Sequence, residues 1–251
     1  MITDRLKIEV QSQSHPGKVR SNNEDALFAS QALGVFAVAD GMGGHERGEW
    51  ASAAIVDRLG EVAGAGDFDS LLDGVSAAIH AANTVIFAES QDKSISMGST
   101  AVALVLKDER FAVMWAGDSR AYVLRDGVLH RLSRDHTRVQ EMVDRGLLTA
   151  EESVGHPMGH VLSRAVGVAR DLELDGIADA PSPGDIFLLC SDGLYGVVGD
   201  DEIAGVLASS TLAEAAGNLI DLCLARGAPD NVTVVLVRVS EATVLSFAGQ
   251  A

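Results

Sequence analysis

The chain has 251 residues, of which 47% are apolar and 22% charged, and 36 acidic against 19 basic side chains give a formal net charge of −17. This composition excludes an intrinsically disordered protein and is sufficient for a large buried core. The strong acidity also argues against binding to nucleic acid or to an anionic membrane through overall charge, so we expect neither as a partner.

The cellular location and the domain organisation can be inferred from what the sequence lacks. It contains no run of 18 apolar residues, and residues 1–10 lack the hydrophobic stretch of a signal peptide. The two cysteines, Cys190 and Cys223, lie inside apolar runs and are expected to be buried thiols in a reducing compartment. We therefore expect a cytoplasmic protein. Because no linker or repeat divides the chain, we expect a single domain over residues 1–251. We also expect a monomer.

Apolar runs and capping signals predict alternating groups of strands and helices. In chain order they indicate a strand at 35–40, helices at 50–62 and around 72–86, strands at 100–107, 111–118, 121–132 and 185–192, a helix opened by the capping box Thr211–Glu214, and a last strand at 231–239. The run 121–132 is a hairpin, since Asp126-Gly127 is a favoured two-residue turn. Such hairpin neighbours packed by helices indicate an α+β sandwich of mostly antiparallel sheets.

Residues 136–167 follow a different pattern. A short amphipathic helix is predicted at 136–145 and a second one after the capping box Thr149–Glu152, and the sequence is then irregular and rich in glycine and histidine. We interpret this segment as a flap over a site, with a plain long loop as the alternative. His156 and His160 have the spacing of a zinc-binding helix, but proline and glycine between them break that helix, so we expect surface histidines.

Four aspartates stand at the ends of predicted strands. Asp40, Asp118 and Asp192 each close an apolar run, and Asp230 precedes the last one. Carboxylates that are far apart in sequence can converge at the mouth of a sheet, where they repel one another unless cations lie between them. Hard oxygen ligands favour magnesium or manganese over zinc. The pattern therefore predicts an oxygen-ligated metal site, whereas Asp126 is assigned to its turn.

Other phosphate chemistries do not fit the motifs. A dinucleotide-binding loop needs glycine where Glu46 stands, and an aspartyl-phosphate enzyme needs a second aspartate where Val38 stands. Neither cysteine has an arginine six residues later, as a cysteine phosphatase requires. Ser119 lies in a Gly-x-Ser-x-Ala sequence, but a strand rather than a helix follows, so we do not expect it to be a nucleophile.

Arg20 lies just before a polar and acidic run that ends in Glu24 and Asp25. One interpretation is a solvated turn with a surface ion pair. The other is a guanidinium fork for a phosphate group, with Glu24 orienting a metal-bound water. The sequence alone leaves both open.

Eight segments together resemble the metal-dependent protein phosphatases of the PP2C (PPM) family in their compact bacterial form. In chain order they are VRSNNED, FAVADGMGGHERGEWAS, GSTAVALVL, WAGDSRAYVLRDG, LSRDHT, LSRAVG, LLCSDGLYGVV and GAPDNVTVVLV, and they span residues 19–237. The resemblance implies a four-layer α-β-β-α sandwich of two antiparallel sheets flanked by helices, with residues 136–167 as the flap.

The resemblance also implies a set of metal ligands. Asp40 would bridge two ions, with the carbonyl of Gly41 on one of them. Asp192 and Asp230 would complete the first ion, and Glu24 would hold a water of the second.

Three further positions match the family. Asp118, helped by Asp192, corresponds to the third metal position of bacterial members. Arg20 corresponds to the phosphate-binding arginine, and Asn231 to the asparagine beside the last aspartate.

One position departs from part of the family. Several eukaryotic members have histidine where this chain has Met42, and that histidine is proposed to protonate the leaving group. Other bacterial members share the methionine. His45 is close in sequence and is either a surface residue or the missing acid, and a metal-bound water is an equal alternative.

The implied activity is hydrolysis of phosphoserine and phosphothreonine in proteins, with two Mn²⁺ or Mg²⁺ ions and a third position. A metal-bridging water or hydroxide would attack phosphorus directly, and Asp40, Asp192 and Arg20 would be the catalytic residues. The substrates would be products of a bacterial Ser/Thr kinase. The alternatives are a binding module on the same fold that has lost catalysis, and a small-molecule phosphatase with the same metals.

Overall fold

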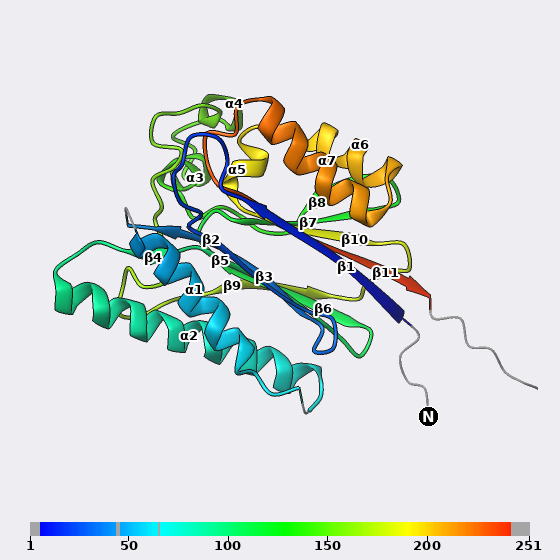
Figure 1. Ribbon diagram of the computed structural model, residues 1–251, viewed down its shortest axis with the longest axis horizontal. Coiled ribbons are helices and arrows are strands. Elements are labelled where there is room, and N and C mark those ends of the chain that lie inside the picture. The colour runs from blue at the N-terminus through cyan, green and yellow to red at the C-terminus, as the bar shows by residue number, and fades with distance from the viewer. Residues whose placement is uncertain (1–5, 44–45, 65, 242–251) are drawn as a thin grey trace, which may run out of the picture.

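Two antiparallel β-sheets stacked face to face form the centre of the protein (Figure 1). The computed structural model describes residues 6–43, 46–64 and 66–241. The first sheet has the strand order β1-β11-β10-β7-β8, formed by β1 (Leu6–His15), β11 (Val232–Glu241), β10 (Ile186–Cys190), β7 (Arg120–Arg125) and β8 (Val128–Arg131). The second has the order β2-β3-β5-β6-β9, formed by β2 (Asp25–Ser30), β3 (Val35–Met42), β5 (Ala101–Lys107), β6 (Arg110–Ala116) and β9 (Asp175–Asp179), with β4 (Gly98–Ser99) paired to β3.

The two sheets pack on each other through large apolar side chains at alternate positions of their strands. On β3, Phe36 and Val38 point between the sheets, whereas Val35, Ala37 and Ala39 point to the opposite face. The inter-sheet core contains Phe36, Val38, Val102, Leu104, Leu106, Phe111, Val113, Trp115, Ala121, Val123, Phe187, Leu189, Val235, Val237 and Val239. Because both faces of these strands are buried, their sequences read as continuous apolar runs.

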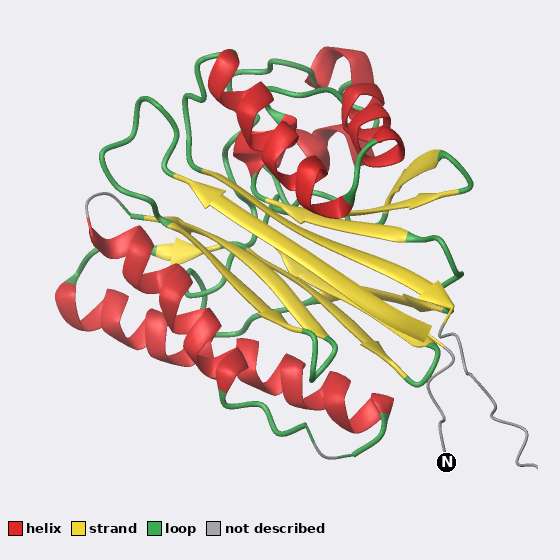
Figure 2. Ribbon diagram, turned by 45° about the vertical axis from the view of Figure 1, so that its right-hand side comes forward, coloured by secondary structure: helices red, strands yellow, loops and turns green. Residues whose placement is uncertain are grey.

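Helices cover the outer face of each sheet, which confirms the predicted four-layer α-β-β-α sandwich (Figure 2). The second sheet packs against α1 (Glu46–Gly60) and α2 (Phe68–Lys93). The first sheet packs against α6 (Asp200–Ser209) and α7 (Leu212–Ala225), with the short α5 (Asp192–Tyr195) beside them. Alanines at 37, 39, 101, 103 and 112 lie on the face toward α1 and α2, so these helices can approach the sheet closely.

The long helix α2 has the length and mean hydropathy of a membrane span, but packing on the sheet explains this composition. Its residues Phe68, Leu71, Val75, Ile79 and Ile86 are buried at helical spacing against the second sheet and α1. The opposite face carries exposed charged groups. Both ends are capped, by an aspartate side chain before the first turn and a left-handed residue after the last.

The predicted hairpin turn and capping boxes are confirmed, while several elements were missed. Asp126 and Gly127 both have positive φ, as a type I′ turn requires, and the Thr211 box opens α7. The strands β1, β2 and β9 and the helix α6 were not predicted, and α1 begins four residues before the predicted Trp50. Strands β1, β2 and β9 lie at sheet edges, where only one face is strongly buried, so their apolar signal is weaker.

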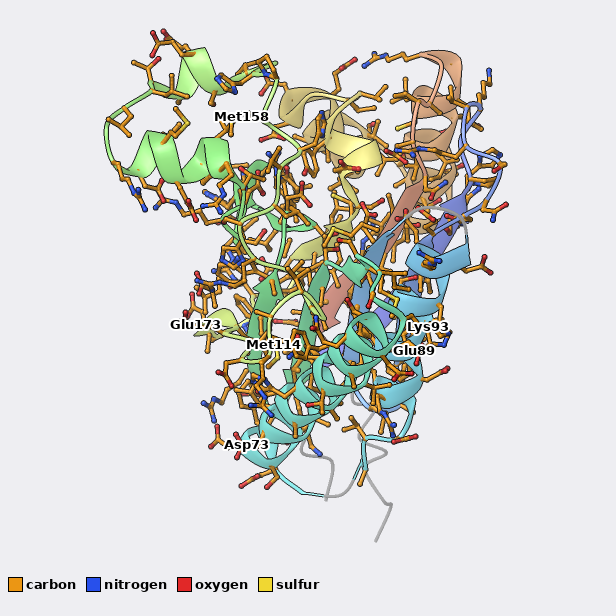
Figure 3. The ribbon with its side chains drawn as sticks, turned by 90° about the vertical axis from the view of Figure 1, so that its left-hand side faces the viewer. Asp73, Glu89, Lys93, Met114, Met158 and Glu173 are labelled. Carbon is orange, nitrogen blue, oxygen red and sulfur yellow. The ribbon has the colours of Figure 1, made fainter. Side chains whose placement is uncertain are left out.

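The segment predicted as a flap lies between β8 and β9, and Met158 marks it in Figure 3. It contains α3 (Arg138–Asp144) and α4 (Ala150–Ser153), whose first turns are capped by Thr137 and Thr149. The buried Asn83 of α2 ties the end of this segment to the sandwich, because its amide accepts from Gly167 N and donates to two carbonyls at 169 and 170. The base of the segment is thus anchored although its middle is exposed.

Phe187 tests the inter-sheet core, since it is 1% exposed and its ring packs edge-on against Phe111 of the other sheet at 4.9 Å. Phe187→Ala is expected to lower the free energy of unfolding by about 3–5 kcal/mol, because it removes contacts from both sheets and leaves a cavity. Urea unfolding measures this loss. Val128→Ala, on an exposed hairpin strand, should change stability by less than about 0.5 kcal/mol, and an equal loss in both variants would contradict the assigned core.

Candidate metal and phosphate site

A cavity of about 430 Å³ opens at one end of the sandwich and collects the predicted site residues. Its lining includes Arg20, Glu24, Asp40, Gly41, Asp118, Asp192, Asp230 and Asn231. These residues come from loops and strand ends spread over more than two hundred positions, and the fold brings all of them together. The remaining candidate, His45, lies outside the described residues.

Strand alternation explains why the acids face this cavity. Asp40 follows Phe36 and Val38 on β3, so its side chain lies on the same face, at the edge of the inter-sheet core. Asp25 of β2 is directly opposite Asp40 in the antiparallel register and therefore shares that face. The apolar layer between the sheets thus ends in a pair of opposed carboxylates.

Hydrogen bonds hold the backbone of Asp40 in place without using its carboxylate. Its N–H donates to Thr100 Oγ1 at 2.9 Å, and its carbonyl accepts from Thr100 N at 2.8 Å. The Thr100 hydroxyl lies 2.6 Å from that of Ser119, and both side chains are buried. Ser119 therefore supports this turn, in agreement with the prediction that it is not a nucleophile.

The close approach of α1 to the strand end depends on two glycines. A Cβ on Gly41 would lie 2.0 Å from the carbonyl oxygen of Gly48, and a Cβ on Gly48 would lie 2.7 Å from the carboxyl carbon of Glu24. Side chains at these positions would push the helix away from β3 and displace Glu24. The glycines after Asp40 thus place α1 and Glu24 against the site.

Asn231 fastens the loop that carries Arg20 and Glu24. Its side-chain oxygen accepts from Glu24 N at 2.8 Å, and its amide donates to the carbonyls of Pro16 and Asn22, both at 2.9 Å. Next to it, Arg20 Nη2 donates to Asp230 Oδ2 at 2.7 Å. Both partners of this ion pair are partly exposed, so the guanidinium stands at the cavity rim where a phosphate group can reach it.

A second network supports the turn that carries Asp118. His136 Nδ1 accepts from Gly117 N at 3.1 Å, so the ring proton is on Nε2, which faces Asp175 Oδ2 at 3.1 Å. The hydroxyl of Tyr195 donates to the carbonyl of Asp118 at 2.9 Å. The sequence assigned His136 to a helix of the flap, but it is buried and precedes α3, which begins at Arg138.

Asp25 is a site residue that sequence reasoning did not single out. It is buried, Ser191 Oγ donates to its Oδ2 at 2.7 Å, and its Oδ1 is the one buried side-chain oxygen or nitrogen without a hydrogen bond among the described residues. A buried carboxylate oxygen without a donor is costly unless a cation or a proton satisfies it. The sequence signal was an aspartate that opens a strand directly after Glu24.

The gathered carboxylates shift one another's pKa. Burial, followed by repulsion from Asp25, Asp192, Asp118 and Asp230, raises the pKa of Asp40 well above its ordinary value. Burial is also the main reason why the pKa of Asp25 and that of Asp118 rise to about 7. Each raised pKa means that ionising the carboxyl group costs more free energy in this cavity than in water.

The donor chemistry fits divalent cations that prefer oxygen. Five aspartates and Glu24 surround the region, no cysteine lines the cavity, and Asp25 Oδ1 lacks a protein donor. As the described side chains stand, no three His, Cys, Asp or Glu residues form a compact ligand group. The fit to divalent cations therefore rests on three features, which are the carboxylate oxygens, the Asp25 Oδ1 atom without a donor and the repulsion between the acids. Bound cations would coordinate the oxygens and reduce the repulsion.

His160 also belongs to this cavity, although the sequence placed it on the flap surface together with His156. Its side chain is 86% exposed, but it lines the cavity, and its Nδ1 lies 3.6 Å from Asp192 Oδ2. The contact with the Asp192 carboxylate raises the pKa of His160. His156 instead accepts a local hydrogen bond from Met158 N. Only the path of the flap distinguishes the two histidines.

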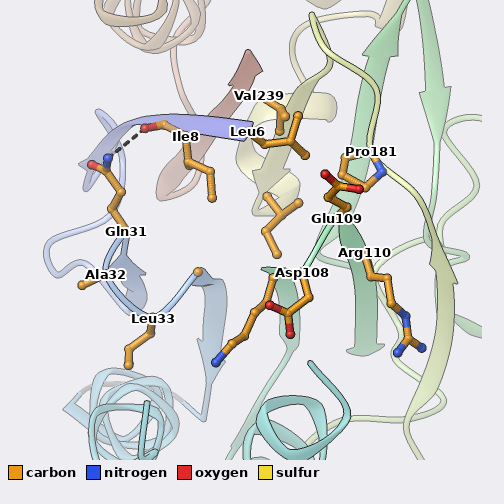
Figure 4. A pocket seen from close by; sticks show the side chains of 13 residues that line it. Leu6, Ile8, Gln31, Ala32, Leu33, Asp108, Glu109, Arg110, Pro181 and Val239 are labelled. Atoms are coloured by element: carbon orange, nitrogen blue, oxygen red, sulfur yellow. Dashed lines mark hydrogen bonds between the residues drawn. The ribbon is translucent and has the colours of Figure 1, made fainter. Parts of the chain in front are cut away.

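A smaller cavity of about 170 Å³ lies at the opposite end of the sheets (Figure 4). Its lining combines apolar side chains, among them Leu6, Ile8 and Leu33, with charged ones. Its two acids, Asp108 and Glu109, are flanked in sequence by Lys107 and Arg110. This balanced charge gives neither a carboxylate cluster nor a phosphate-binding group. We therefore assign the chemistry to the carboxylate cavity.

Comparison with known proteins shows to which family the chain belongs. The family profile described as Protein phosphatase 2C matches residues 10–142, more than half of the chain. The chain belongs to the protein phosphatase 2C family. Serine/threonine protein phosphatase PstP of Mycobacterium tuberculosis is 39% identical over 236 residues, which cover 93% of this chain and 45% of PstP. The chain thus spans about half the length of that relative.

Shorter relatives of the protein phosphatase 2C family match along most of their length. The serine/threonine phosphatase stp of Listeria monocytogenes is 34% identical over 231 residues, which cover 88% of this chain and 92% of stp. Among solved structures, PppA of Pseudomonas aeruginosa matches with a TM-score of 0.87 and 41% identity over 92% of this chain and 97% of PppA. A PstP catalytic domain in complex with two manganese ions matches with a TM-score of 0.83 and 38% identity over 94% of this chain and all of that domain.

The raised pKa values predict how pH affects the stability of this protein phosphatase 2C domain in chelator. In the folded protein Asp25 and Asp118 have a pKa of about 7, against about 3.9 for an unfolded chain. The folded state holds more protons between these values, so stability should fall as pH rises from about 4 to about 7. Thermal unfolding in chelator should therefore give a lower Tm at about pH 8 than at about pH 5.5.

Substitution and metal addition test the same point. Asp118→Asn should reduce the pH-dependent loss, because the amide carries no charge to bury. Added Mn²⁺ should raise the Tm of the wild-type protein, and more at the higher pH, since binding then displaces fewer protons. A pH-independent Tm in chelator would show that these acids are not strained in the fold.

Proposed function

We propose that the protein hydrolyses phosphoserine and phosphothreonine esters in proteins, with Mn²⁺ or Mg²⁺ held by the carboxylate cavity. The observation that carries this is the convergence of Asp40, Asp118, Asp192 and Asp230 in one cavity with Arg20 at its rim. A set of acids without cations would repel a phosphate, and an arginine alone would not activate water. Together they combine the two requirements of phosphate ester hydrolysis.

The groups that would hold the ions are Asp40, Asp192, Asp230, the carbonyl of Gly41 and, through a water, Glu24, with Asp118 for a third ion. Divalent ions bound there supply Lewis acidity and lower the pKa of a coordinated water. The residues of the chain position these groups. Thr100 fixes Asp40, Asn231 fixes the loop of Glu24, and the turn at Gly117 fixes Asp118.

Arg20 is the phosphate-binding residue in this proposal. Its planar fork can donate two parallel hydrogen bonds to phosphate oxygens, which a lysine cannot reproduce. The Asp230 carboxylate holds the guanidinium at the rim, so less side-chain freedom is lost when a phosphate binds. The exposure of Arg20 fits a group that meets an incoming macromolecule.

The biological setting is part of the proposal. The substrates would be phosphoproteins made by a Ser/Thr kinase, and the protein would act in the cytoplasm as a monomer. A catalytically silent binding module is less well supported, because such a module has no need for a set of strained carboxylates. A small-molecule phosphatase with the same ions remains the competing activity, and substrate comparison separates the two.

Turnover of a phosphothreonine peptide is expected to be negligible in chelator and restored by Mn²⁺ or Mg²⁺. Asp40→Asn and Asp192→Asn should lower kcat by about a hundredfold or more, because each removes a charge that holds an ion. Asp126→Asn is the matched control, since Asp126 lies in a hairpin turn away from the site and asparagine tolerates its positive φ. Full activity of Asp40→Asn would overturn the site assignment.

Arg20→Ala should mainly raise KM, by about tenfold or more, since a charge-assisted contact with the phosphate is lost. Arg20→Lys should be intermediate, because it keeps the charge but not the fork. Initial rates with a phosphopeptide, a sugar phosphate and a nucleotide decide the substrate class. A higher kcat/KM for the small molecules than for the peptide would favour the competing activity.

A further inference from the structure

A larger hollow lies directly beside the carboxylate cavity. This hollow, called here the α1–α2 hollow, has a volume of about 740 Å³ and is lined by Ser21, Asn22, Arg47, Trp50, Glu89, Lys93, Ile95 and Met97. Its walls are the loop after β1, the first turns of α1, the end of α2 and the segment before β4. Apart from the Asn22 carbonyl, which accepts from Asn231, none of these residues has a role in the site described above.

The hollow and the cavity share two walls. Arg20 lines the cavity, and the next two residues, Ser21 and Asn22, line the hollow. Ser96 lines the cavity, while its neighbours Ile95 and Met97 line the hollow. Consecutive Cα atoms are about 3.8 Å apart, so the residues that line the cavity and those that line the hollow are direct neighbours. A bound polypeptide can therefore extend from the phosphate-binding arginine into the hollow.

The wall provided by α1 is aromatic and positively charged. Trp50 is 40% exposed, and it is the only aromatic side chain among the exposed large hydrophobic residues in the described part of the chain. Arg47, one turn earlier, is exposed and forms no ion pair within the described residues. An exposed tryptophan beside an unpaired arginine is a combination common at protein-binding surfaces.

The opposite wall is close to neutral in charge. Glu89 and Lys93 of α2 form an ion pair one helical turn apart, and Figure 3 shows them close together beside α1. Ile95 and Met97 add apolar surface between them and the cavity. The charges of Glu89 and Lys93 cancel, so Arg47 gives the hollow a net positive charge, in a protein whose overall charge is −17.

We propose that the α1–α2 hollow binds the polypeptide that flanks the phosphorylated residue of a substrate. The bound segment is extended, places an apolar side chain against Trp50 and carries an acidic residue next to Arg47. This inference rests on the proposed phosphatase function and adds a sequence preference to it. Trp50 and Arg47 are then specificity-determining residues outside the metal site.

The continuity with the cavity selects this occupant. A polypeptide whose phosphate is held by Arg20 must continue along one of the walls next to Arg20, and Ser21 and Asn22 lead into the hollow. Glu89 and Lys93 pair with each other, so Arg47 is the one charged side chain left for a ligand among the described residues of the hollow, whereas a small metabolite is held by several converging polar groups. The acidic exterior disfavours acidic peptides in general, so an acidic preference can arise only near a local cation such as Arg47.

The test compares phosphothreonine peptides that differ at one flanking position. Leucine replaces serine at each of four positions on either side of the phosphothreonine, and kcat/KM is measured with Mn²⁺. On one side, leucine is expected to raise kcat/KM by about tenfold, equivalent to about 1.4 kcal/mol, mainly through KM. Trp50→Ala should abolish this gain and Trp50→Phe should restore most of it. Hydrolysis of p-nitrophenyl phosphate, which is too small to reach the hollow, should be unchanged.

A charge exchange tests Arg47 independently. The wild-type protein should prefer a glutamate over a lysine next to the apolar residue, and Arg47→Glu should reverse this preference. Arg58→Glu on the same helix is the matched control, because Arg58 is exposed but lies at the other end of α1. It should leave the preference intact.

The outcomes separate this inference from the function on which it rests. If the wild-type protein cleaves p-nitrophenyl phosphate but no phosphopeptide, the proposed protein phosphatase function fails. If it cleaves the peptides but leucine has no effect at any position, or if Trp50→Ala keeps the same preference, the inference about the hollow is wrong. Equal losses for peptide and p-nitrophenyl phosphate in Trp50→Ala would likewise contradict it, since they indicate a disturbed site.

Discussion

The site depends on one electrostatic constraint, which is the opposition of Asp25 and Asp40 across neighbouring strands. Their side chains share the inner face at the end of a layer filled by Phe36 and Val38. Like charges at directly opposed positions destabilise a sheet, and burial raises the cost further. The register cannot relax to avoid this, because a slip of one residue would turn Phe36 and Val38 toward the helices and place Val35, Ala37 and Ala39 between the sheets. The hydrophobic layer therefore stabilises a site that repels itself until cations bind.

Neutral side chains keep this strained arrangement in order. The side chains of Thr100, Asn231 and His136 each bind backbone groups next to a carboxylate and do not themselves occupy the carboxylate oxygens. Such hydrogen bonds contribute only about 1 kcal/mol each to stability. Their larger effect is on position, since ligands placed far apart in sequence must arrive within a fraction of an ångström. In this protein phosphatase 2C fold, one set of residues thus holds the loops in place, and a different set, the carboxylates, faces the cavity.

Under the proposed function, local cations reconcile an acidic protein with a phosphorylated substrate. With a net charge of −17 the surface as a whole does not attract phosphate groups. Attraction would come from divalent ions in the carboxylate cavity, from Arg20 at its rim and from Arg47 in the adjoining hollow. In the proposed complex, recognition depends on the short path between these groups and on apolar contact with Trp50. This arrangement favours a flexible chain that carries a phosphate over a compact charged molecule.

The sequence by itself determined the features that depend on local pattern. Apolar runs that end in aspartate predicted the central strands and the convergence of Asp40, Asp118 and Asp192 in one cavity. The Asp126 turn and the Thr211 box were also correct, and both cysteines are buried. Only the tertiary structure decided which residues meet. The unsatisfied oxygen of Asp25, the entry of His160 into the cavity and the hollow beside Arg20 depend on strand register and on the path of the flap. Periodicity and capping are set by neighbours along the chain, whereas these juxtapositions arise from contacts between segments that no local pattern encodes.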